Sequence, residues 1–151
     1  STRENSQMRK EALSMGISQI SAGSRTNPGG YSEDKSLEQF SLGDHRSLDE
    51  VIRDISSMGY VPSFCTGCYR LGRTGADFMD LAKPGLIKHY CLPNALTTFA
   101  EYLVNYGSAE TQTEGWKLID KMVNDIPGAD IRKKTIENLE LAKKGVTDLY
   151  V

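Results

Sequence analysis

Three cysteines, Cys65, Cys68 and Cys91, constrain this chain more than any other feature of its sequence. Only two residues separate Cys65 from Cys68, and a turn of that length points both sulfurs to the same side, with Gly67 easing the bend. An odd number of cysteines in this pattern favours metal or redox chemistry in a reducing compartment over a disulfide framework. We therefore expect a cytoplasmic protein that holds a metal between residues 65 and 91.

Spacing alone leaves the kind of metal site open. A four-iron cluster on three protein sulfurs has one iron without a protein ligand, where an external molecule can bind. Alternatively, His89 could complete a tetrahedral Cys₃His zinc site with the three cysteines. A third interpretation is cysteines that bind no metal. A redox dithiol is disfavoured because the surrounding residues lack the βαβ pattern of thioredoxin-like proteins.

Charge and hydropathy exclude two classes of partner. The 18 basic and 20 acidic residues give a net charge of −2, and no basic stripe could neutralise a row of phosphates. No apolar run reaches the length that crosses a bilayer, and residues 1–5 are too polar for a signal peptide. We expect neither nucleic acid nor a membrane as a partner. A hydrophobic content of 38% indicates an ordinary folded protein.

The first part of the chain predicts a helix, a strand and a long loop. Ser1 and Glu4 have capping-box spacing, and apolar residues then recur at helical intervals until Gly16. Residues 17–22 follow directly and are predicted to form a rather polar strand. Residues 23–46 are rich in Gly, Ser, Asn and charge, which indicates a long loop.

A second helix completes this part. Ser47 and Glu50 form another capping box, and a clear apolar face follows until Gly59. The order of helix, strand, loop and helix is that of the end of a repeating β/α chain. We therefore assign residues 1–59 to the last strand and helix of a (β/α) barrel.

Residues 60–151 are predicted to be mainly helical. Thr74 can cap a short helix that stops near Pro84, and three further helical patterns are separated by Gly107 and by the Pro-Gly pair at 127–128. The inner faces of two of these helices are marked by Leu96, Phe99 and Leu103 and by Trp116, Ile119 and Val123. The predicted fold class is thus α/β followed by mainly α.

Four stretches together resemble one known family. They are Ile-Ser-Gln-Ile-Ser-Ala-Gly-Ser-Arg-Thr at 17–26, Pro-Gly-Gly-Tyr at 28–31, Gly-Asp-His-Arg-Ser-Leu-Asp-Glu-Val at 43–51 and Ser-Phe-Cys-Thr-Gly-Cys-Tyr-Arg-Leu-Gly-Arg-Thr-Gly at 63–75. In this order they resemble the C-terminal part of the HydG family, the radical S-adenosylmethionine (SAM) tyrosine lyases of [FeFe]-hydrogenase maturation, including its biotin and thiamin synthesis-associated region. The related tyrosine lyases of thiamine synthesis share the barrel end but lack the C-terminal cysteine set.

The resemblance implies a barrel end followed by a helical iron–sulfur domain. That domain would carry an auxiliary [4Fe–4S] cluster with an additional iron on Cys65, Cys68 and Cys91. In this family the barrel cleaves tyrosine into p-cresol and dehydroglycine, and dehydroglycine gives CO and cyanide. A cysteine molecule bound at the auxiliary cluster then holds the iron on which an Fe(CO)₂(CN) unit is assembled. The parent enzyme also uses SAM and a second [4Fe–4S] cluster, and it works with other hydrogenase maturation proteins.

The resemblance also suggests which other residues contact ligands. Arg3 and Ser21 are candidates to hold the tyrosine carboxylate by charge-assisted hydrogen bonds. Arg70 and Arg73 flank the cysteine pair and are candidates to stabilise an anionic iron–cyanide species. The alternative for each arginine is a solvated surface charge. No catalytic residue is assigned, and we expect this chain alone to be inactive, because the Cys-x3-Cys-x2-Cys motif of the radical-generating cluster does not occur in it.

Two other function classes fit the same sequence. One is a helical binding module stiffened by structural zinc, and the other is a metal-free interaction domain. Metal analysis and an absorption spectrum would separate colourless zinc from brown iron–sulfur protein.

Overall fold

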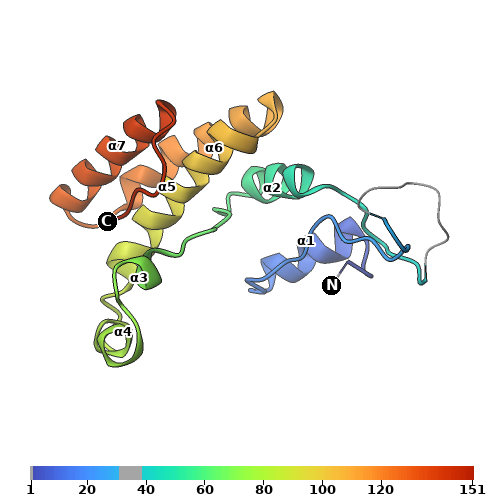
Figure 1. The fold of residues 1–151 in the computed structure, drawn as a ribbon, viewed down its shortest axis with the longest axis horizontal. Coiled ribbons are helices and arrows are strands. Elements are labelled where there is room, and N and C mark those ends of the chain that lie inside the picture. The colour runs from blue at the N-terminus through green and yellow to red at the C-terminus, as the bar shows by residue number, and fades with distance from the viewer. Residues whose placement is uncertain (1, 31–38) are drawn as a thin grey trace. The chain divides into compact units, whose positions relative to one another are not determined.

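The computed structural model describes residues 2–30 and 39–151, so the expectations for Ser1, for Tyr31 and for part of the loop at 23–46 lie outside it. Its described part contains seven α-helices and one short 3-10 helix, drawn in Figure 1. The chain forms two compact units, Ser1–Val51 and Ile52–Val151. The division falls inside helix α2 (Leu48–Ser57). The predicted boundary between residues 59 and 60 stays a prediction.

The first unit contains helix α1, Ser6–Ser14. Its N-cap is Asn5, whose side chain accepts a 2.9 Å hydrogen bond from the backbone N–H of Met8. The helix therefore begins later than the predicted capping box at positions 1 and 4, because asparagine caps a helix as well as serine does. Gly16, with a φ of 100°, follows the helix end, as predicted.

Residues 17–22 are irregular, so the predicted strand is absent. A strand is stabilised by hydrogen bonds to a neighbouring strand, and no described segment forms such a ladder with these residues. Instead, the guanidinium of Arg9 donates a hydrogen bond to the carbonyl of Ser21. The barrel end predicted for residues 1–59 is therefore not shown.

A buried ion pair joins α1 to the end of the loop at 23–46. Arg9 and Asp44 are 5% and 4% exposed, and the Arg9 guanidinium contacts the Asp44 carboxylate directly. Arg46 donates to the same carboxylate through Nε and Nη2, at 2.9 and 2.7 Å. The hydrogen bonds from Arg46 hold the pKa of Asp44 well below its usual value, and the bond from Arg9 adds to the effect.

Helix α2 confirms the second capping box. The Glu50 carboxylate accepts from the backbone N–H and the hydroxyl of Ser47, at 2.7 and 2.8 Å, and the Ser47 hydroxyl accepts from the Glu50 N–H at 3.3 Å. The chain leaves the helix at Gly59, whose φ is 85°. The predicted extent of this helix is therefore confirmed.

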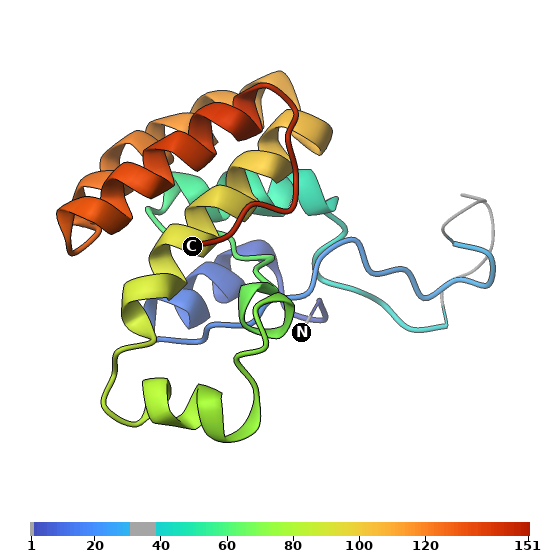
Figure 2. The same cartoon turned by 60° about the vertical axis from the view of Figure 1, so that its left-hand side comes forward.

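Three long helices form the body of the second unit. They are α5 (Lys88–Tyr106), α6 (Ala109–Met122), continued by the 3-10 helix η1 (Val123–Asp125), and α7 (Ala129–Lys143). Helix α5 packs against both α6 and α7, as Figures 1 and 2 show. The predicted helices and the breaks between them are confirmed. No helix in the described part of the chain is long and apolar enough to cross a bilayer.

Large apolar side chains fill the space between these helices. The fully buried ones include Ile52, Leu96, Phe99, Leu103, Ile119 and Ile126. Helix α6 comes close to α5 at Gly115, where a Cβ atom would stand only 2.5 Å from Leu103 Cδ2. The predicted inner face of α5 is confirmed, and Trp116 packs at the edge of this core.

Two short helices precede α5 and lead to the predicted metal region. Helix α3 spans Gly67–Arg70 and α4 spans Gly75–Ala82, next to Thr74 as expected. The Thr74 side chain makes no cap hydrogen bond. Helix α4 thus separates the cysteine pair from the start of α5 at Lys88.

Candidate metal centre

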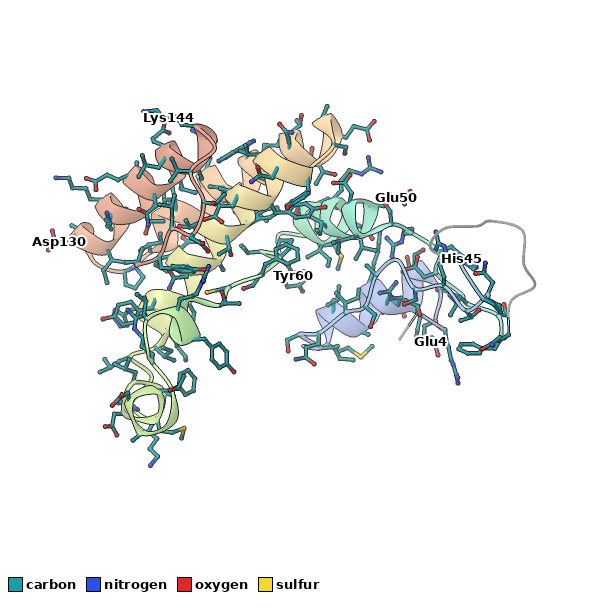
Figure 3. All side chains as sticks on the ribbon, viewed as in Figure 1. Glu4, His45, Glu50, Tyr60, Asp130 and Lys144 are labelled. Atoms are coloured by element: carbon teal, nitrogen blue, oxygen red, sulfur yellow. The ribbon has the colours of Figure 1, made fainter. Side chains whose placement is uncertain are left out.

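The three cysteines come from two separate parts of the second unit. Cys65 precedes α3, Cys68 lies in α3, and Cys91 lies in the first turn of α5. Figure 3 draws the side chains along the path from Tyr60 through α3 to α5. All three thiols are free; Cys65 and Cys68 are half-buried and Cys91 is exposed.

These thiols are near enough for their charges to act on one another. The pKa of Cys91 is raised, first by partial burial and then by the negative charges of Cys68 and Cys65. A cation at this place would offset that repulsion, and thiolates are the ligands that soft metals and iron–sulfur clusters prefer. The donor set therefore fits a thiolate-bound metal or cluster.

The geometry does not form the Cys₃His zinc site. Sulfurs around one zinc ion stand about 3.8 Å apart, because each Zn–S bond is about 2.3 Å in a tetrahedron. In the part of the chain that the structure describes, no three His, Cys, Asp or Glu residues are grouped so as to hold one ion. His89 is exposed and lies two residues before Cys91 on the same helix, a spacing that points side chains apart. The cysteines of a four-iron cluster bind different irons of one cubane, so their sulfurs stand farther apart than sulfurs around a single zinc ion.

The backbone around the cysteine pair supports the thiols. The N–H of Gly67 donates to the Sγ of Cys65 at 3.3 Å, a contact that stabilises negative charge on sulfur. Gly67 is buried, and a Cβ there would stand 3.0 Å from Tyr150 Cδ1 and 3.1 Å from Asn94 Nδ2. A larger residue at position 67 would push residues 65–73, here called the cysteine loop, away from both neighbours.

The two arginines next to the cysteines have different surroundings. Arg70 pairs with Asp148 and donates through Nε to the Tyr150 hydroxyl at 3.4 Å, so it is engaged by the end of the chain. The bond to Tyr150, followed by the contact with Asp148, raises the pKa of Arg70 further. This arginine is already paired at the protein surface.

Arg73 retains a free donor. Its guanidinium stacks 4.2 Å from the ring centre of Tyr90, and Nη2 donates to the carbonyl of Val151 at 3.2 Å. Its Nη1 is buried and has no hydrogen-bond partner among the described residues. A buried donor without a partner is costly, which fits an acceptor that is supplied by a ligand.

Arg3 and Ser21, the predicted tyrosine contacts, lie in the first unit. Both are exposed, and the guanidinium of Arg3 lies over the ring of Phe40, 4.8 Å from its centre. Neither lines the cavity of about 150 Å³ in this unit, which is bordered by Glu4, Met8, Arg9, Ala12, Leu13, Ile17, Gln19 and Ile20. Their role in substrate binding stays a prediction.

Sequence reasoning missed Asn94 and the end of the chain. Asn94 is 2% exposed and lies one turn after Cys91 in α5. The signal that could have revealed it is an asparagine placed three residues after Cys91, a spacing that puts both side chains on one side of the helix. Nothing in the pattern of residues 148–151 indicates that they return to the cysteine loop.

Comparisons with known proteins agree with the predicted family. Residues 1–61 match the Biotin and Thiamin Synthesis associated domain. The chain is 41% identical over 63 residues to the 2-iminoacetate synthase of Salmonella typhimurium, covering 41% of this chain and 17% of the relative. It is 36% identical over 74 residues to the Escherichia coli 2-iminoacetate synthase, covering 48% and 20%.

A solved structure matches nearly the whole chain. The crystal structure of HydG, a maturase of the [FeFe]-hydrogenase, aligns with 99% of this chain at 47% identity and a TM-score of 0.88. This chain covers 33% of that structure. The chain thus spans about a third of HydG and about a fifth of the 2-iminoacetate synthases. Together the matches confirm the resemblance to the C-terminal part of HydG.

Proposed function

We propose that this chain is the cluster-bearing C-terminal part of a radical SAM tyrosine lyase of the HydG type. The proposal rests on one observation above all: a chain with free thiols at Cys65, Cys68 and Cys91 aligns over 99% of its length, at 47% identity, with a hydrogenase maturase. Cys65, Cys68 and Cys91 would hold an auxiliary [4Fe–4S] cluster with an additional iron.

The chain's own residues would hold and surround that cluster. When bound, the cluster supplies an iron without a protein ligand, at which a small molecule such as cysteine can bind. The Gly67 N–H stabilises the sulfur of Cys65, and the free Nη1 of Arg73 offers a positive donor to an anionic ligand. Arg70, already paired with Asp148, is the weaker of the two candidates for this role.

The first unit would complete the lyase barrel. Its match to the Biotin and Thiamin Synthesis associated domain supports this assignment. Arg3 and Ser21 would hold the carboxylate of tyrosine, and SAM with its own cluster would bind elsewhere in the parent enzyme. We infer that the parent acts in the cytoplasm and delivers an Fe(CO)₂(CN) unit to other hydrogenase maturation proteins. The chain by itself should not form p-cresol.

Anaerobic reconstitution tests the cluster assignment. The chain is incubated with iron and sulfide, desalted and examined by metal and sulfide counting and by EPR after reduction. We expect about four irons per chain from the core cluster, with any additional iron above that number. Each of Cys65→Ala, Cys68→Ala and Cys91→Ala should lower the count, because each removes a ligand.

A matched control is Met79→Ala, which removes a partly exposed sulfur from the neighbouring helix α4. This variant should bind as much iron as the wild type. Stoichiometric zinc with a colourless spectrum, or iron retained by all three alanine variants, would overturn the proposed function.

A further inference from the structure

The end of the chain returns to the cysteine region. Residues 148–151, here called the strap, follow α7 and run back beside α5, as the red segment in Figures 1 and 2 shows. The backbone N–H of Leu149 donates to Glu101 of α5 at 3.1 Å, and Asn138 of α7 donates to the carbonyl of Tyr150 at 3.4 Å. The strap is therefore attached to two helices of the core.

Asn94 makes the most specific of these attachments. Its Oδ1 accepts from the backbone N–H of Val151 at 2.7 Å, while its Nδ2 donates to the carbonyl of the same residue at 3.3 Å. One buried amide thus satisfies both backbone groups of Val151, which fixes the strap in a single register. Asn94 lies one turn after Cys91, so this register is set next to a predicted ligand.

The opposite side of the strap contacts the cysteine loop. The Tyr150 hydroxyl lies 3.3 Å from Thr66 Oγ1 and accepts from Arg70 Nε at 3.4 Å. Arg73 donates to the carbonyl of Val151 at 3.2 Å. Thr66 lies between Cys65 and Cys68, and Arg70 and Arg73 follow the pair. The strap therefore connects that pair to the helix that carries Cys91.

We propose that the strap, anchored by Asn94, is a positioning device that sets the separation between Cys91 and the pair Cys65 and Cys68. That this positioning serves cluster binding rests on the proposed function. The positioning itself is a property of the metal-free chain. Asn94 and Tyr150 act through other residues and bind no iron themselves. Apart from the strap, Arg73 stacks on Tyr90 of α5, and Phe64, which precedes Cys65, stacks on Tyr102 of the same helix with ring centres 5.2 Å apart. The strap adds the hydrogen-bonded contacts at Thr66 and Arg70.

The first test uses the metal-free chain. Hydrogen–deuterium exchange is compared in the wild type, in Asn94→Ala and in Asn105→Ala. Asn105 is an exposed asparagine of the same helix whose side-chain amide donates to the Glu101 carbonyl. Asn94→Ala should raise exchange in residues 65–73, while exchange in α5 and α6 stays at the wild-type level. Equal exchange at 65–73 in all three proteins would overturn the strap, whether or not the chain binds a cluster.

The second test uses the reconstituted chain. Loss of iron to a chelator should be about 10-fold faster, or more, in Asn94→Ala than in Asn105→Ala, which is the range seen when the supports of metal ligands are removed. Equal rates would contradict the positioning role. If the wild type takes up no cluster, the proposed function fails, and the exchange experiment still decides the strap.

Asn94 is buried, so its alanine variant can be less stable throughout. Tyr150→Phe removes only the hydroxyl that contacts Thr66 and Arg70 and leaves the packing of the ring on Gly67. It should increase exchange at 65–73 less than Asn94→Ala does, with the core unaffected. If Asn94→Ala unfolds and Tyr150→Phe exchanges like the wild type, the strap is rejected.

Discussion

At the scale of single residues, Arg9 and Asp44 form a buried ion pair. Removing one partner of such a pair leaves the other uncompensated, at a cost of about 3–5 kcal/mol. We therefore expect Asp44→Ala to lower the free energy of unfolding by about that amount at pH 7, measured by urea unfolding. Asp120→Ala, which removes an exposed carboxylate of α6, should change it by less than about 0.5 kcal/mol.

Asp44 also makes the free energy of unfolding depend on pH. The folded-state pKa of Asp44 is lowered, so its contribution is present above the unfolded value of about 3.9 and is lost as the pH falls toward the folded value. The stability of the wild type should thus decline from about pH 4 downward, and the difference from Asp44→Ala should shrink. A difference that stays constant down to pH 2 would show that the ionised carboxylate is not the source.

At the scale of one element, the capping box of α2 is the clearest local determinant. Ser47→Ala removes the hydroxyl that accepts from Glu50 N–H and should cost about 1 kcal/mol in urea unfolding. Ser57 provides the control, because its hydroxyl bonds to a carbonyl near the helix end and its alanine variant should be close to neutral. Equal losses in the two variants would contradict a specific role of the cap.

The helices of this chain could be predicted from its sequence, whereas contacts between distant residues could not. The helices at 48–57, 88–106 and 129–143 were predictable because caps, apolar spacing and Gly or Pro breaks act within a few residues. The irregular structure of residues 17–22 was not predictable, because a segment with a strand-like sequence forms a strand only when a partner distant in sequence pairs with it. In the candidate site, a short motif reveals the cysteines, whereas the contact between Asn94 and Val151 joins residues 57 positions apart.

At the scale of the whole molecule, stability of the second unit depends on the core between α5, α6 and α7. Phe99 is fully buried there, and Phe99→Ala should lower the free energy of unfolding by about 3–5 kcal/mol through lost burial and the cavity left behind. Tyr106 of the same helix is 77% exposed, so Tyr106→Ala should change it little. Urea unfolding of both variants measures the two changes. Similar decreases in the free energy of unfolding would contradict a core centred on Phe99.

The close approach of α6 to α5 at Gly115 limits how this protein can be engineered. Exchanging a helical glycine for alanine is a common way to make a scaffold more heat-resistant, with a gain of about 1 kcal/mol. At Gly115 the added methyl group would clash with the side chain of Leu103. Leu103 is fully buried, so the surrounding core would have to shift to accept the methyl group. A sturdier scaffold should therefore start from solvent-facing positions of α6 such as Thr113, whose hydroxyl bonds only to its own helix.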